Sequence, residues 1–105
     1  MFDINYFKEH VKEELDDAKG YIDAAIEAKI NYPAWVYYLV KMADNEAEHA
    51  GHLMGMFETC IRNKTLTSTS QDPALAQANP ETVYKDLMKH YGETMTYVIN
   101  MKRGL

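Results

Sequence analysis

Apolar residues recur along this chain at alternating steps of four and three, which is the spacing of one face of an α-helix. In the first third of the sequence the positions at these steps are Ile4, Phe7, Val11, Glu14, Ala18, Tyr21, Ala25 and Ala28. The middle third continues with Trp35, Leu39, Met42, Glu46, His49, Leu53, Met56 and Cys60. The pattern predicts two long amphipathic helices, each with a stripe that we expect to be buried.

Residues typical of helix ends set the bounds of these two helices. Asp3 is a favourable N-cap, so the first helix is expected over about residues 3–29. Pro33 suits the first turn of a helix, and the second helix is expected from there to about residue 64. Because the joint between them is short, the two helices should form an antiparallel hairpin.

A third helix is expected near the carboxyl end. Residues 65–80 are rich in Thr, Ser, Gln and Asn and predict a surface loop. The Asn79-Pro80 pair favours a helix start, and the helix should run over about residues 81–102. Its apolar stripe consists of Tyr84, Leu87, Tyr91, Val98 and Met101. No alternation typical of strands is evident, so we expect one all-α domain over residues 1–105.

Three ionisable residues interrupt the two long stripes. Glu14 lies on the first helix, and Glu46 and His49 form a Glu-x-x-His pair on the second. Residues three apart share a helix face, and the hairpin places Glu14 at a similar depth to Glu46. An unpaired carboxylate in a core costs several kcal/mol, so these groups need a partner, and a shared metal ion would supply it. The sequence therefore predicts a metal site at Glu14, Glu46 and His49.

One chain holds only half of the ligands that dinuclear four-helix bundles use. The third helix does not complete the set, because the corresponding position on its stripe is Thr94. A two-fold homodimer would bring together four helices, four carboxylates and two imidazoles. Oxygen and nitrogen ligands without a thiolate favour iron, with manganese as the second choice. We therefore expect a homodimer or larger homo-oligomer with a dinuclear site at its interface.

These residues resemble the ferritin-like superfamily, and most closely its short two-helix members, the encapsulated ferritins. The resemblance rests on Glu14 with Tyr21 seven residues later, and on the stretch Glu46-Ala47-Glu48-His49-Ala50 with Leu53 one turn on. It covers roughly residues 7–60. It implies that Glu46 bridges two iron ions, that Glu14 and His49 are terminal ligands, and that Tyr21 donates a hydrogen bond to a ligand. It also implies oxidation of ferrous iron by dioxygen, which is ferroxidase activity. The third helix and the loop before it are not part of this pattern.

A second interpretation needs no metal. A Glu-x-x-His pair alone is frequent on solvated helix faces, and Glu13 and Asp17 make the surroundings of Glu14 acidic. The alternative is a non-catalytic helical dimerisation module, in which a buried Glu/His network specifies the register of the dimer. His10 and His52 are expected to be surface residues in either case.

Composition narrows the classes of partner. The chain has 105 residues, a net charge of −5 and 47% hydrophobic residues. Its basic residues are scattered among acidic ones, so we expect no nucleic-acid partner. No apolar run approaches the roughly 18 residues that a membrane-spanning helix needs, so we expect no membrane partner. One cysteine, Cys60, and no evident secretory signal favour a cytoplasmic location.

Overall fold

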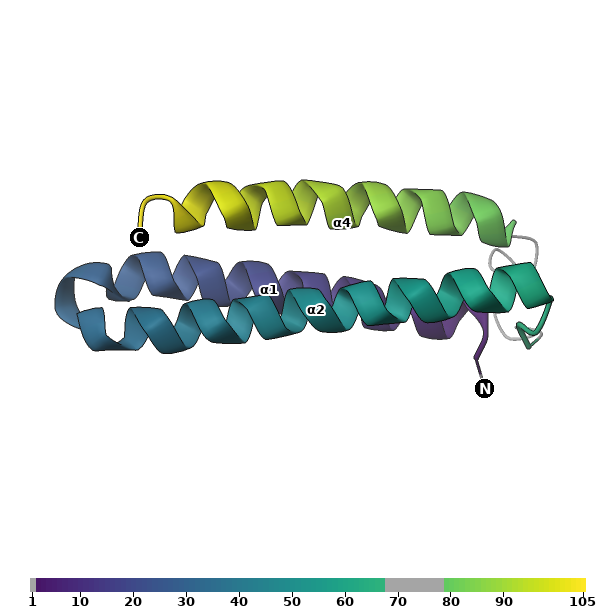
Figure 1. Ribbon diagram of the computed structural model, residues 1–105, viewed down its shortest axis with the longest axis horizontal. Coiled ribbons are helices and arrows are strands. Elements are labelled where there is room, and N and C mark those ends of the chain that lie inside the picture. The colour runs from purple at the N-terminus through teal and green to yellow at the C-terminus, as the bar shows by residue number, and fades with distance from the viewer. Residues whose placement is uncertain (1, 68–78) are drawn as a thin grey trace.

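The computed structural model consists of three helices and describes residues 2–67 and 79–105. Helix α1 spans Ile4–Asn31, α2 spans Pro33–Asn63 and α4 spans Pro80–Lys102. They lie side by side in a rod of 49 × 22 × 18 Å, in which α1 and α2 form an antiparallel hairpin and α4 runs along it (Figure 1). The all-α prediction is confirmed, and most of the predicted loop over residues 65–80 lies outside the described residues.

Local signals fix the helix ends as the sequence predicts. The Asp3 carboxylate caps α1 by accepting a hydrogen bond from the Tyr6 amide at 2.7 Å. Pro33 is at the first position of α2, where its missing N–H costs nothing. The Asn79 side chain caps α4 by accepting from the Glu81 amide at 2.8 Å. The observed bounds therefore fall within two residues of the predicted ones.

The core lies where the three helices meet. One apolar cluster consists of Phe7, Val11, Leu15, Ala50, Met54, Phe57 and Leu87, and a smaller one of Ile22, Ala43 and Val98. Phe7 and Phe57 stack with their ring centroids 4.9 Å apart, which joins the N-terminal end of α1 to the C-terminal end of α2. Alanines along the middle of α2 allow α1 to approach closely. Both clusters include an α4 residue, so α4 is part of the core.

The predicted phase of the buried stripes is wrong in part. On α1 the expected apolar residues are buried, but Leu15 and Ile22 take the places expected for Glu14 and Tyr21. On α2 the buried residues are Ala43, Ala47, Ala50, Met54 and Phe57, so the whole stripe is shifted. The observed stripe of α2 keeps the steps of four and three but is offset by one residue, about 100° around the helix, from the predicted one. Packing by α4 moves the core toward the α4 side.

Contacts from α4 reach one side of the hairpin. Tyr97 donates a hydrogen bond to Asp23 on α1, and Lys102 forms an ion pair with Asp44 on α2 at 2.8 Å. A Cβ atom added at Gly51 would lie 3.4 Å from the Tyr91 hydroxyl. Glu46 is two residues from Asp44, and His49 is two residues from Gly51. Two residues correspond to about 160° around the helix. The predicted metal ligands of α2 therefore lie on the side that α4 leaves open, and α4 supplies no ligand among the described residues.

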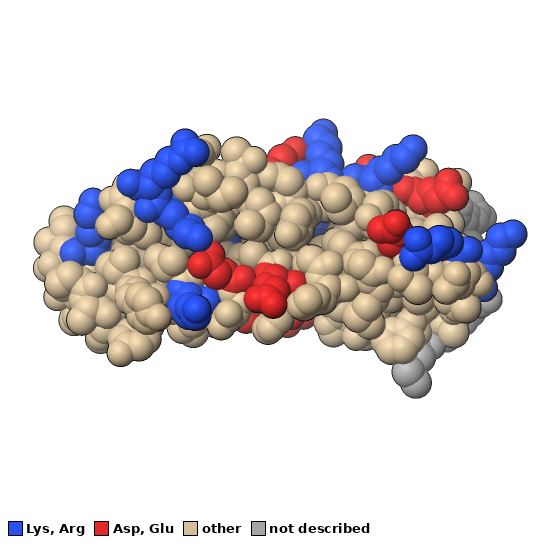
Figure 2. Space-filling model, viewed as in Figure 1, with Lys and Arg blue, Asp and Glu red and all other residues tan. Residues whose placement is uncertain are grey.

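Charged side chains are mixed on the surface that Figure 2 shows. Basic side chains on this face are separated by acidic and uncharged ones and form no continuous stripe. Among the described residues, no helix combines the length and hydropathy needed to cross a membrane.

Candidate metal centre

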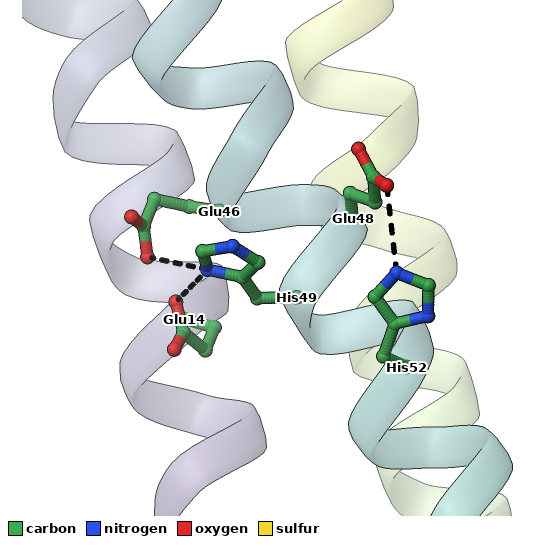
Figure 3. Close-up of polar contacts among 5 residues, drawn as sticks. All are labelled: Glu14, Glu46, Glu48, His49 and His52. Atoms are coloured by element: carbon green, nitrogen blue, oxygen red, sulfur yellow. Dashed lines mark ion pairs between the residues drawn. The ribbon is translucent and has the colours of Figure 1, made fainter.

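Glu14, Glu46 and His49 converge between α1 and α2. The His49 Nδ1 atom lies 3.6 Å from Glu14 Oε2 and 3.9 Å from Glu46 Oε2 (Figure 3). One ligand atom from each residue lies within 4.8 Å of the other two. The structure therefore brings together the three residues that the sequence singles out.

The helix geometry explains this convergence. Glu46 and His49 are three residues apart on α2, so their side chains leave the same face of the helix. Glu14 reaches them from α1 because the antiparallel hairpin puts residue 14 at the same depth. Figure 3 shows all three side chains directed into the space between α1 and α2. The predicted depth of Glu14 is confirmed.

The spacing of these atoms suits a metal ion. Ligands bound at about 2.1 Å from one ion lie roughly 3.0–4.2 Å from each other, depending on geometry. The two distances from His49 fall within this range. Small rotations of the side chains would therefore place all three donors around one ion, and the positions facing solvent would stay open for other ligands.

Glu14 carries an unsatisfied oxygen. Its Oε2 atom is buried and accepts no hydrogen bond from any donor in the described residues. Leaving a buried acceptor without a partner costs about 1–3 kcal/mol, and more when the group is charged. His49 Nδ1 is the nearest nitrogen, but 3.6 Å is too long for a hydrogen bond. A cation or a proton at this point would satisfy the oxygen.

Glu14 affects the protonation of Glu46. The pKa of Glu46 is raised above its ordinary value of 4.5, first because its side chain shares a hydrogen bond with Glu14. Partial burial and repulsion from the Glu14 carboxylate act in the same direction, and His49 opposes them. A hydrogen bond between two carboxyl groups needs a proton on one of them. A bound cation would replace that proton and remove the repulsion.

The site is open to solvent in the single chain. The side chain of His49 is 55% exposed, and those of Glu14 and Glu46 are 25% and 22% exposed. The expectation that all three are buried is therefore wrong for one protomer, for the same reason as the shift of the α2 stripe. The exposure leaves room for ligands from outside the chain.

The other residues considered from the sequence lie outside the cluster. His52 pairs with Glu48 at 3.4 Å on a different side of α2, as Figure 3 shows. The His10 ring packs against Tyr6. Both histidines are exposed, as expected. Tyr21 is half-buried beside the smaller core cluster, and no hydrogen bond joins it to the three ligands within the described part of the chain. Its proposed role therefore stays a prediction.

Comparison of the chain with protein-family models, with curated proteins and with solved structures gave no match.

Proposed function

We propose that this protein binds a metal ion through Glu14, Glu46 and His49, and that a homodimer completes the site. The observation that carries the proposal is the convergence of two carboxylates and an imidazole, with one carboxylate oxygen buried and without a donor. A proton shared with Glu46 would satisfy that oxygen but would neutralise only one of the two glutamates. A metal ion would satisfy it and also balance the charge of both glutamates.

The open face of the hairpin supports the dimer. Trp35, Met42 and Met56 lie on the same side of α2 as Glu46 and His49 and are 54%, 40% and 43% exposed. Exposed apolar residues gathered around polar ligands are typical of an interface. A second copy on this face would bury them and bring three more ligands to the site, which gives the ferritin-like four-helix arrangement.

Two iron ions suit the completed ligand set. Four carboxylates and two imidazoles match the donors of dinuclear carboxylate sites, in which the ions lie about 3.5–4 Å apart. In this arrangement Glu14, Glu46 and His49 of both chains would hold the ions, and the bridging role that the resemblance implies would belong to Glu46. Iron is the first choice because the set has no thiolate, and manganese would use the same donors. The resemblance to encapsulated ferritins supports the same assignment.

We infer ferroxidase chemistry at this site. Two ferrous ions held side by side would supply the two electrons that, with two protons from water, reduce dioxygen to hydrogen peroxide. The protein's part is to hold the two ions close together and to keep positions open for dioxygen. Tyr21 on the open side of α1 is the residue proposed to orient a ligand. The cytoplasmic location and the absence of nucleic-acid and membrane partners remain expectations of this proposal.

Iron oxidation in air is the direct test of this activity. We expect the metal-free protein to oxidise added ferrous iron clearly faster than buffer alone, measured as the rise in near-ultraviolet absorbance of ferric iron. A variant with Glu14 and Glu46 both replaced by Gln should oxidise iron no faster than buffer. If the unmodified protein is also no faster than buffer, the ferroxidase assignment is wrong. Absence of metal binding as well would favour the non-catalytic dimerisation module.

A further inference from the structure

The open side of α2 carries a continuous apolar stripe centred on the two ligands. Its members are Trp35, Leu39, Met42, Glu46, His49, Leu53, Met56 and Cys60. All of them are exposed or half-buried in the protomer, although six of the eight are apolar. At 1.5 Å per residue the stripe is roughly 37 Å long. The stripe lies mostly on the side of α2 away from α4. Its members Leu53 and Cys60 also pack in part against the main core cluster, and Cys60 lies near the start of α4.

The spacing of this stripe reads the same in both directions. Its successive steps are four, three, four, three, four, three and four, and its midpoint falls between Glu46 and His49. A two-fold axis through this midpoint, perpendicular to α2, superposes the stripe on its own positions. Such an axis packs α2 against the partner's α2 in the antiparallel direction.

This symmetry pairs chemically compatible residues. Glu46 lies against the partner's His49, a carboxylate against an imidazole. Met42 meets the partner's Leu53, and Leu39 meets the partner's Met56. Trp35 meets the partner's Cys60. Every apolar member therefore meets an apolar member, and the charged groups meet at the centre, where the metal ligands are needed.

We propose that the second copy packs with its α2 antiparallel to that of the first, in the register that places Trp35 beside the partner's Cys60. This inference rests on the proposed dimeric metal site and specifies its partner surface. In this register the Trp35 indole of each chain covers the C-terminal end of the partner's α2. Both ends of the dimer interface are then closed by apolar side chains.

Cysteine cross-linking tests this register, because Cys60 is the chain's single cysteine. W35C should be linked to Cys60 by a bismaleimide that spans the roughly 8–10 Å between packed helices. Positions 35 and 60 are roughly 37 Å apart within one helix, so this link can form only between chains. We expect most of the protein to run as a covalent dimer, with the 35–60 link identified by peptide mass spectrometry.

Matched controls make the result specific. The unmodified chain should give no covalent dimer, because its two Cys60 residues are at opposite ends of the interface. Y37C places a thiol at an exposed position about 200° around α2 from residue 35 and should not link to Cys60. Because loss of the indole could weaken the dimer, a second variant, L39C/M56C/C60S, keeps Trp35 and should form a 39–56 link.

The outcomes separate this inference from the proposed function. Links between 35 and 60 and between 39 and 56 support the register even if no metal binds. A 60–60 link in the unmodified chain, equal linking of Y37C, or no link in either test variant would overturn the register. Metal content of the unmodified chain is measured separately, so the metal site can stand or fail independently.

Discussion

Replacing His49 with alanine should abolish metal binding. The imidazole Nδ1 is the one nitrogen donor of the cluster and lies within 4 Å of both carboxylates. Its removal would take a ligand from each half of the proposed dimeric site, which leaves carboxylates alone. Loss of a ligand and of the orientation that it gives to its neighbours should reduce metal content from about one ion per chain to near zero. Elemental analysis of protein purified without chelator measures this.

His52 provides the matched control for that substitution. It lies on the same helix and pairs with a glutamate, Glu48, but on a different side of α2 (Figure 3). His52→Ala should leave metal content unchanged. If His49→Ala keeps the metal content of the parent, His49 is not a ligand. If His49→Ala lowers stability in a protein that never contains metal, the Glu/His network of the dimerisation module is the better account.

Added metal should raise the melting temperature strongly at neutral pH. A ligand that binds only the folded protein stabilises it by about 2.7 kcal/mol at a concentration 100 times its Kd. For a chain of this size that corresponds to a rise of roughly 10–20 °C. The pKa of Glu46 is raised by its hydrogen bond with Glu14, by partial burial and by repulsion from the Glu14 carboxylate, and metal would relieve this repulsion. Calorimetry with and without ferrous iron under anaerobic conditions measures the shift.

In the metal-free protein, the raised pKa of Glu46 shows whether its carboxylate stabilises or destabilises the fold. Because folding raises the pKa of Glu46, folding favours the protonated form of this group. The ionised carboxylate therefore destabilises the fold at neutral pH. This penalty is relieved as the pH falls through the raised pKa, and it is absent below the ordinary value of 4.5.

Glu46→Gln isolates this effect, because it removes one negative charge and one metal ligand together. Without metal, the variant should be as stable as the parent or more stable at neutral pH. Its melting temperature should rise little when metal is added. A metal-free variant that melts well below the metal-free parent would contradict the carboxylate repulsion and would favour a hydrogen-bonded network.

The sequence predicts the helices well because their ends depend on local chemistry. Asp3, Pro33 and Asn79 act through the first turn of their own helices, so no knowledge of the rest of the fold is needed. The proximity of Glu14 to Glu46 also follows, since a short joint forces the two helices to be antiparallel and fixes their relative depth.

The burial of the stripes depends on tertiary packing, and here the sequence is a weaker guide. Leu15 and Ile22 are adjacent to Glu14 and Tyr21, about 100° around the helix, so the rotation of α1 about its axis decides which member of each pair faces the core. On α2 small alanines face the core, whereas the larger Trp35, Met42 and Met56 face outward. The sequence prediction takes the large apolar residues to be the core. On α2 it therefore identifies the face that we propose to be the dimer interface.

The central claim is that two chains together hold the metal, and it is tested most directly by measuring metal and mass in the same species. The protein should be loaded with ferrous iron without air and separated by size exclusion, with light scattering and elemental analysis of the eluted peak. The account predicts a dimer, or a larger assembly of dimers, with about one iron per chain. A monomer that retains tightly bound iron, or a dimer that binds none, would contradict it.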